Sequence, residues 1–296
     1  MHIIDTIADL RTHQSQLTGT VGLVPTMGYL HQGHLSLIKA AKETCDTVVA
    51  TIFVNPTQFS ANEDLDLYPR DMPRDLALLN DAGVDLVFTP TPTLMYPPRF
   101  QTWVTVEEVT QEREGAKRPE HFRGVTTVVA KLFNLVQPDI AFFGQKDAQQ
   151  VVVIRQMVRD LNMPLSIQVC PIVREPDGLA LSSRNVYLQP NERQAARVLN
   201  IALQQVGQAY ENGERHPDTL RKIVQDTVNR EPLAQLDYVS VADAATLTEI
   251  TDASDNPLLV SLAAQVGKPR LLDNCLLPLH LNTRDYATQT LGFVNT

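Results

Sequence analysis

The sequence predicts an α/β protein in which a doubly wound parallel-sheet domain is followed by a smaller α+β domain. Apolar, β-rich runs alternate with helical patterns in the first half of the chain, and this alternation stops after about residue 175. With 296 residues, 43% of them hydrophobic, the chain is long enough to bury a full core in two domains. We therefore expect domains at residues 1–175 and 176–296, joined near residues 175–185.

The first domain is expected to alternate strands with helices. Its strands are predicted at residues 21–25, 47–54, 85–90, 139–144 and 166–173. Its helices are predicted at residues 34–45, 74–83, 126–139 and 147–162. Because helical crossovers connect parallel strands, these elements predict one parallel sheet covered by helices.

The second domain has a different pattern. Helices are predicted at residues 191–214 and 216–230, and strands at residues 236–243, 256–266 and 269–277. Strands that follow helices in this way indicate a small α+β domain. The last segment, residues 280–296, matches no assignable pattern and is expected to be a peripheral extension.

Charge and cysteine content exclude several classes of protein. A net charge of -9 and a pI near 5.2 argue against a general polyanion binder, so an anionic ligand needs a local cationic pocket. The three cysteines are odd in number and far apart, which excludes a disulfide framework and a CxxC motif. No signal-peptide pattern and no apolar run of membrane-spanning length occurs. We expect a cytoplasmic protein with neither a nucleic-acid nor a membrane partner.

The stretch LVPTMGYLHQGHLSLIKAAK places two histidines where a buried strand is followed by a helix. His31 and His34 lie three residues apart in the first turn of that helix, where free N–H groups and the helix dipole favour an anion. Both imidazoles can donate to phosphate oxygens, and Gly33 lets a nucleotide lie against the backbone. The motif therefore predicts a triphosphate site.

Other interpretations of the HxGH motif stay open on the residues alone. The histidines could cap the helix or be ordinary surface groups, or they could be metal ligands on one helical face. Zinc would need a third ligand, and no Cys or His stands near in sequence, although a distant one could fold in. A Walker A loop is rejected, because Gly33 is followed by His34 and Leu35 where that motif needs Lys and then Ser or Thr.

Two further motifs carry phosphate-binding groups. GQKD, Gly144–Asp147, follows a predicted strand and offers Lys146, although a solvated lysine beside an Asp147 helix cap is an alternative. GLALSSRN, Gly178–Asn185, offers two hydroxyls and a guanidinium, but it could also be a polar connection between domains. Each motif alone is modest evidence.

Taken together, six ordered motifs resemble one known family. They are VPTMGYLHQGHLSLI, IFVNPTQFSANEDLDLYPRD, HFRGVTTVVAKLFN, FFGQKDAQQ, VREPDGLALSSRNVYL and, more faintly, PRLLDNCLL. The chain resembles the pantothenate synthetases, or pantoate:β-alanine ligases, over nearly its whole length. In this family HxGH and SSRN are similar to the HIGH and KMSKS signatures of class I aminoacyl-tRNA synthetases, which adenylate a carboxylate within a Rossmann-like fold.

The resemblance implies an AMP-forming ligase with two half-reactions. The pantoate carboxylate attacks the α-phosphate of ATP to give pantoyl adenylate and pyrophosphate, and the β-alanine amine then displaces AMP. It implies Mg²⁺ as the companion of ATP, held mainly by phosphate oxygens and water. No protein ligand of the metal is predicted; Asp75 could be an outer partner or only an acid in the first turn of a helix. A homodimer is also implied.

Individual residues receive roles from the same resemblance. The catalytic residues would be His34, His31 and Lys146, with His34 nearest to an acid or charge-stabilising role and Lys146 on the phosphates in the transition state. The ATP site would comprise Met27, Gly28, Tyr29, Leu30, His31, Gln32, Gly33, His34, Gly144, Gln145, Lys146, Asp147, Val173, Leu181, Ser182, Ser183 and Arg184. Gln58 and Gln150 would bind pantoate or β-alanine, with Asn55, Tyr68 and Arg123 as neighbours.

Two other functions remain possible on the sequence. Another nucleotidyltransferase, such as a cytidylyltransferase or adenylyltransferase, would share HxGH but would not need NPTQF or HFRG, so these motifs favour the ligase. A non-catalytic nucleotide-binding module would be expected to lack at least one charged or imidazole group of the site, and none is lost here.

Overall fold

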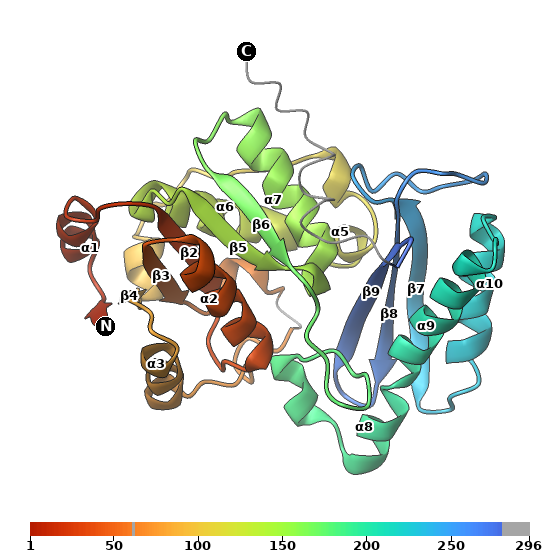
Figure 1. The fold of residues 1–296 in the computed structure, drawn as a ribbon. Coiled ribbons are helices and arrows are strands. Elements are labelled where there is room, and N and C mark those ends of the chain that lie inside the picture. The colour runs from red at the N-terminus through yellow and green to blue at the C-terminus, as the bar shows by residue number, and fades with distance from the viewer. Residues whose placement is uncertain (61–62, 280–296) are drawn as a thin grey trace. The chain divides into compact units, whose positions relative to one another are not determined.

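The computed structural model describes residues 1–60 and 63–279, so the extension predicted at residues 280–296 lies outside the described residues. The chain forms two compact units (Figure 1). The first comprises residues 1–144 and 153–170, and the second comprises residues 145–152 and the chain from residue 171 onward. The domain boundary expected between residues 175 and 176 stays a prediction.

The first unit contains a six-stranded sheet in which every pair of neighbouring strands is parallel, in the order β1-β4-β3-β2-β5-β6. The strands are β1 (His2–Ile4), β2 (Val21–Thr26), β3 (Thr47–Ile52), β4 (Leu86–Phe88), β5 (Ile140–Gly144) and β6 (Ser166–Cys170). The strand order reverses between β2 and β5. In open parallel sheets such a switch point is where ligands bind, beyond the carboxyl ends of the strands.

Helices follow or precede the strands of this sheet along the chain, and two of them, α2 and α3, contribute apolar side chains to its core. The helices in this part of the chain are α1 (Ile7–Gln14), α2 (Gln32–Thr44), α3 (Met72–Asp81), α4 (Pro92–Met95), α5 (Glu114–Lys117), α6 (His121–Val136) and α7 (Ala148–Asp160), with short 3₁₀ turns η1 (Pro56–Gln58) and η2 (Glu108–Thr110). The turn η3 (Gln145–Asp147) and residues 148–152 of α7 belong to the second unit. Ile38 of α2 and Leu79 of α3 share a core cluster with the strand residues Val24, Ala50 and Val87. The 3.6-residue period of the helices and the two-residue period of the strands both place these side chains inward.

The second unit contains an antiparallel sheet in the order β7-β8-β9. Its elements are η4 (Ser183–Tyr187), α8 (Pro190–Ala195), α9 (Val198–Glu211), α10 (Pro217–Val228), β7 (Ala234–Asp243), β8 (Leu258–Val266) and β9 (Arg270–Leu277). Leu203 of α9 and Leu220 of α10 pack in one core with Val260 and Leu262 of β8. The small α+β character of this unit is thus confirmed, as is the fold class as a whole.

The predicted elements differ from the structure in several places, and the differences at α8 and α9, at β6 and at β1 have a clear physical reason. The helix expected over residues 191–214 is wrong as one element, because the N–H groups of Arg197 and Leu199 bond to the carbonyls three residues back and break the run between α8 and α9. The strand expected to reach residue 173 ends at Cys170, since Pro171 has no N–H for the ladder. Strand β1 and helix α1 were not predicted. A three-residue strand gives too short a pattern to recognise.

No helix within residues 1–60 and 63–279 has the length and apolar character needed to cross a bilayer.

Candidate active site

The HxGH motif lies at the switch point of the parallel sheet. Strand β2 ends at Thr26 and is followed by the turn Met27–Leu30 and by α2, while the neighbouring strand β5 ends at Gly144. Parallel neighbours present their carboxyl ends at one edge, so the HxGH turn and Gly144 are at the same edge of the sheet.

The two histidines cap the helix that they begin. The Nδ1 atom of His31 accepts a hydrogen bond from the N–H of Gly33 at 3.1 Å, and Nδ1 of His34 accepts from the N–H of His31 at 3.3 Å. The ring centroids are 4.1 Å apart. A neutral imidazole that accepts at Nδ1 carries its proton at Nε2, so each ring has a donor on its far side. Helix capping, one of the alternatives above, is therefore present, and it sets the tautomer that a phosphate-binding imidazole needs.

A buried carboxylate holds the turn before these histidines. Asp75, only 1% exposed, accepts the N–H of Tyr29 at 2.6 Å and the N–H of Leu30 at 2.8 Å, one on each carboxylate oxygen. The turn needs such support because Gly28 and Tyr29 both have positive φ, at 82° and 50°. Sequence reasoning considered Asp75 as a metal partner or a helix acid and missed this role. A lone acid in a first helical turn gives no signal of a contact 45 residues away.

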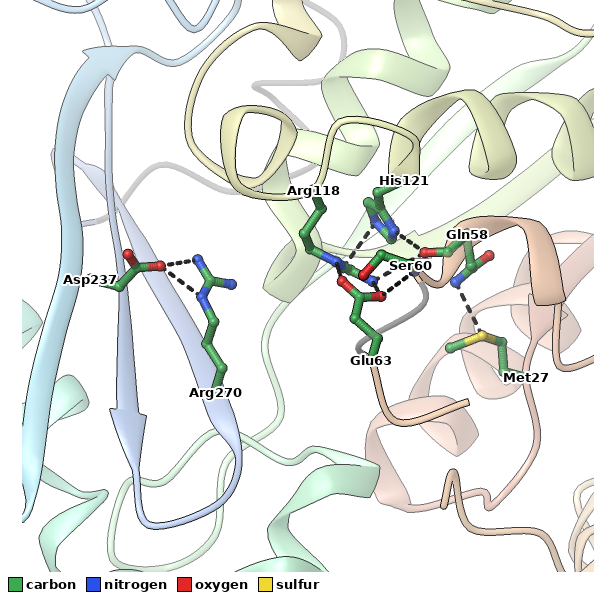
Figure 2. A network of polar contacts seen from close by, with 8 residues as sticks. All are labelled: Met27, Gln58, Ser60, Glu63, Arg118, His121, Asp237 and Arg270. Carbon is green, nitrogen blue, oxygen red and sulfur yellow. Dashed lines mark hydrogen bonds and ion pairs between the residues drawn. The ribbon is translucent and has the colours of Figure 1, made fainter. Parts of the chain in front are cut away.

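Gln58 belongs to the same unit as the histidines and has a defined amide orientation. Its Oε1 accepts from Asn55 Nδ2 at 3.1 Å. Its Nε2 donates to the Met27 sulfur at 3.1 Å, as Figure 2 shows. Asn55 is oriented in turn by the Tyr96 hydroxyl, which donates to Asn55 Oδ1 at 2.9 Å. Gln58 is therefore set to offer N–H donors on its Met27 side, and such donors suit a carboxylate or hydroxyl oxygen of a ligand.

A second network holds the backbone of Gln58 (Figure 2). The Gln58 carbonyl accepts from His121 Nδ1 at 2.9 Å and from Arg118 Nη2 at 3.2 Å. Arg118 also donates from Nη1 to His121 Nε2 at 3.3 Å and binds the Glu63 carboxylate through two hydrogen bonds. Arginine only donates, so His121 accepts at Nε2 and carries its proton at Nδ1. Neither residue was assigned a role from the sequence, although both stand in or beside the HFRG motif.

The ionisation of this network follows from burial and charge. Burial, together with the adjacent Arg118 guanidinium, lowers the pKa of His121 from 6.5 to about 4. Burial favours a higher pKa for Glu63, but the hydrogen bond and charge of Arg118 outweigh it and leave that pKa below its ordinary value. At neutral pH, His121 is therefore neutral and lies between the Arg118 cation and the Gln58 carbonyl. Glu63 and Arg118 beside it are both charged.

Three residues of the GQKD motif, Gln145 to Asp147, belong to the second unit. Gln145, Lys146 and Asp147 form η3 directly after β5, and Lys146 Nζ lies 3.5 Å from Asp147 Oδ1. Lys146 is half-buried and Asp147 is exposed. Gln150 follows, half-buried, in the first turn of α7. The solvated-lysine interpretation is thus too simple, because Lys146 is partly covered and paired.

The predicted phosphate loop is also within the second unit. The N–H of Leu181 bonds to the carbonyl of Val173 at 3.0 Å, which brings these two predicted nucleotide residues together. Ser182 caps η4 by accepting from the N–H of Arg184 at 3.3 Å, and Ser183 is buried. A cap of this kind fixes the loop backbone at the two serines.

The expected neighbours of Gln58 have different surroundings. Asn55 contacts Gln58 directly, as described above. Tyr68 is buried and meets Phe59 edge-on, with ring centroids 6.0 Å apart. Arg123 instead lies over the Trp103 ring at 4.2 Å and pairs with Glu120 at 2.7 Å. Within the described residues, no group of three or more His, Cys, Asp or Glu side chains could hold a metal ion.

A parallel α/β sheet with a capped, imidazole-bearing helix N-terminus at its switch point defines a nucleotide-binding type of protein. The family model described as Pantoate-beta-alanine ligase matches residues 2–276, and the chain belongs to this family.

Named relatives agree with this assignment. The chain is 58% identical to the pantothenate synthetase of Roseiflexus sp. (strain RS-1), over 94% of this chain and 99% of the relative. A crystal structure of pantothenate synthetase from Thermus thermophilus is 45% identical, with a TM-score of 0.88, and covers 93% of this chain and 98% of its own. The pantoate-beta-alanine ligase from Francisella tularensis, complexed with beta-gamma ATP and beta-alanine, is 33% identical with a TM-score of 0.77 over 96% and 99% of the two chains.

Proposed function

We propose that this protein condenses pantoate with β-alanine at the expense of ATP and releases pantothenate, AMP and pyrophosphate. Membership of the pantoate-beta-alanine ligase family over residues 2–276 is the observation that carries the proposal. It is supported by the Francisella relative, whose structure contains an ATP compound and β-alanine.

The reaction has two covalent steps. In the first, a carboxylate oxygen of pantoate bonds to the α-phosphorus of ATP, and the bond to the oxygen that bridges the α- and β-phosphates breaks, so pyrophosphate leaves with that electron pair. In the second, the neutral amine of β-alanine attacks the acyl carbon of pantoyl adenylate. The bond from that carbon to the AMP oxygen then breaks, and the nitrogen loses a proton. The products are pantothenate and AMP.

The first step asks for donors and cations aimed at the phosphates. The Nε2–H groups of His31 and His34 supply donors at a helix N-terminus, and Lys146 supplies a cation for the charge that develops on the leaving pyrophosphate. His34 takes the acid or charge-stabilising role. The other predicted nucleotide residues have separate parts of the ATP to bind. We assign Val173 to the adenine or ribose and the loop Leu181 to Arg184 to the phosphates. The rest line the nucleotide: Met27, Gly28, Tyr29, Leu30, Gln32, Gly33, Gly144, Gln145 and Asp147.

Pantoate needs a different kind of recognition. It carries a carboxylate and two hydroxyls on a dimethyl-branched chain, so amide groups suit its polar atoms. The orientation of Gln58 supports this role, because its amide donors are directed away from Asn55 toward Met27. Gln150 is the second amide that we assign to pantoate or β-alanine.

Mg²⁺ enters as the companion of ATP. We expect phosphate oxygens and water to hold the ion, because Mg²⁺ keeps much of its hydration and is seldom bound by an all-protein cage. The ion supplies charge neutralisation on the phosphates. Asp75 is no ligand in this proposal, since both of its oxygens bind backbone N–H groups.

The proposal also covers the localisation and the oligomeric state of the protein. We place the protein in the cytoplasm, in keeping with three cysteines that are odd in number, lie far apart in the sequence and form no CxxC motif. We also propose a homodimer, which sedimentation or light scattering of the purified protein measures directly.

The proposed reaction is tested by omission and by isotope transfer. AMP must form only when pantoate, β-alanine and MgATP are all present, with one pantothenate per AMP. Pantoate labelled with ¹⁸O in its carboxylate must transfer one ¹⁸O to AMP, because that oxygen becomes part of the phosphate. Release of ADP and phosphate, or unlabelled AMP, would refute the proposed chemistry.

A further inference from the structure

One buried side chain joins the turn η3, Gln145–Asp147, which we call the lysine turn, to the β7-β8-β9 sheet. Asn274 lies in β9 and is 3% exposed. Its Nδ2 donates to the carbonyl oxygen of Gln145 at 3.0 Å and to that of Lys146 at 2.9 Å. Its Oδ1 accepts from the Gln145 side chain at 3.1 Å. All of these atoms belong to the second unit.

The register of the sheet explains why this asparagine is available. Leu271, Cys275 and Leu277 of β9 pack with the apolar core under α9 and α10. Asn274 points to the opposite face because side chains alternate along a strand, and its neighbour across the ladder is Ser261 of β8. A polar side chain buried on that face needs partners, and the carbonyls of the lysine turn provide them.

The residue before Asn274 holds a second part of the predicted nucleotide site. Asp273, 2% exposed, pairs with Arg174 through contacts of 2.6 and 2.8 Å, and Arg174 follows Val173 in the chain. Asp273 also accepts the N–H of Asn274 at 2.8 Å. Two adjacent residues of β9 therefore fasten two segments that lie far away in the sequence.

We propose that Asn274 is a positioning residue that sets the direction of Lys146 by fixing the two carbonyls of its turn. This inference rests on the proposed function, in which Lys146 acts on the phosphates. Fixing successive carbonyls fixes the peptide planes and hence the Cα–Cβ bond from which the lysine extends. A small misplacement of such a group costs rate rather than binding, because the charge it meets develops in the transition state.

The test is the nearly isosteric variant Asn274→Asp. It replaces two donors with a carboxylate that faces two carbonyl oxygens, so the turn must move. We expect kcat to fall about tenfold to hundredfold, with the KM for pantoate changed by less than about twofold. The matched control is Ser261→Ala, on the neighbouring strand. Its buried Oγ has no hydrogen-bond partner within residues 1–60 and 63–279, and its loss should leave kcat unchanged.

A double variant separates positioning from general damage. If Asn274 acts through Lys146, Asn274→Asp should lower kcat no further in a Lys146→Ala background. An unchanged kcat in the single variant, or the same fold-loss with and without Lys146, would overturn the inference. Where circular dichroism shows that Asn274→Asp does not fold, Asn274→Ala is put through the same two comparisons. Turnover by the wild-type protein tests the proposed function separately, because the inference depends only on ratios to it.

Discussion

Two turns at the ends of parallel strands are held by side chains of opposite hydrogen-bonding character. The histidine turn, Met27–Leu30, follows β2 and leads into the HxGH motif, and the lysine turn, Gln145–Asp147, follows β5. Each turn follows a parallel strand and must hold its backbone in a fixed direction. Asp75 accepts two N–H groups of the histidine turn, whereas Asn274 donates to two carbonyls of the lysine turn. Asp75→Asn would therefore place a donor where the turn needs an acceptor, and Asn274→Asp would place an acceptor where the turn needs a donor.

The two turns differ in their local support. The histidine turn is followed by a capping box in which each imidazole binds a backbone N–H two or three residues away. The lysine turn is held by an asparagine that is 128 residues away from Lys146 in the sequence. A capping contact between residues two or three apart can be recognised in the sequence, whereas a contact between residues more than a hundred apart cannot. The histidine turn should accordingly tolerate the loss of its distant support better than the lysine turn does.

The largest effect is expected at the lysine turn itself. Lys146→Ala removes a cation that serves the developing charge on pyrophosphate, so we expect kcat to fall about 10²-fold to 10³-fold. The KM for ATP should change far less, since the interaction belongs to the transition state. Steady-state kinetics with varied ATP measure both quantities. A loss of ATP affinity at normal kcat would contradict this role.

The histidine turn offers a way to separate capping from catalysis. His31→Asn keeps a side-chain acceptor for the N–H of Gly33 but removes the Nε2–H donor. We expect thermal stability to be kept and kcat to fall by about 10²-fold. Thermal melts and turnover on the same preparation give both answers. Normal turnover by the folded variant would leave His31 with capping alone.

Removing the distant support of the histidine turn should cost less. Asp75→Asn turns one acceptor into a donor that faces a backbone N–H, and we expect about 2 kcal/mol of lost stability with roughly a tenfold loss of kcat. Asp71→Asn is the control, because Asp71 caps α3 and asparagine caps helices equally well. Chemical unfolding of both variants decides. Equal stability of the two would deny Asp75 its supporting role.

Gln58 combines local and distant support, since Asn55 orients its amide and His121 holds its carbonyl from 63 residues away. Gln58→Ala removes the amide donors, and we expect the KM for pantoate to rise about tenfold with the KM for ATP unchanged. Varying each substrate in turn measures this. An unchanged KM for pantoate would remove Gln58 from the pantoate site.

The smallest effect concerns pH. Because the pKa of His121 is lowered from 6.5 to about 4 on folding, the unfolded chain takes up a proton first, and stability falls as pH drops from 6.5 toward 4. The full shift corresponds to at most about 3 kcal/mol, and less for a side chain that keeps some exposure. His121→Asn retains a donor for the Gln58 carbonyl and should reduce this pH slope. Urea unfolding at pH 6.5 and at pH 4.5 measures the free energy of unfolding of both proteins. An equal loss of stability between these two pH values in the wild type and in His121→Asn would count against a lowered pKa of His121.

Sequence reasoning succeeded where physical signals are local. Strand and helix periodicity predicted the parallel sheet, and the strand–HxGH–helix pattern predicted the position of the histidines at a helix N-terminus. It could not predict that Asp75 would bind Tyr29 and Leu30, or that Asn274 would bind Lys146. These contacts depend on how distant segments meet in three dimensions, and the residue types involved are common in ordinary loops and strands. The roles of the site residues in binding and catalysis stay predictions.

Exchange of labelled pyrophosphate into ATP tests the adenylate intermediate most directly. The wild-type protein is incubated with MgATP and pantoate in the absence of β-alanine. We predict exchange that requires pantoate and that falls sharply in Lys146→Ala. A protein that makes pantothenate with all three substrates, but shows no pantoate-dependent exchange, would contradict the formation of pantoyl adenylate and pyrophosphate before β-alanine reacts.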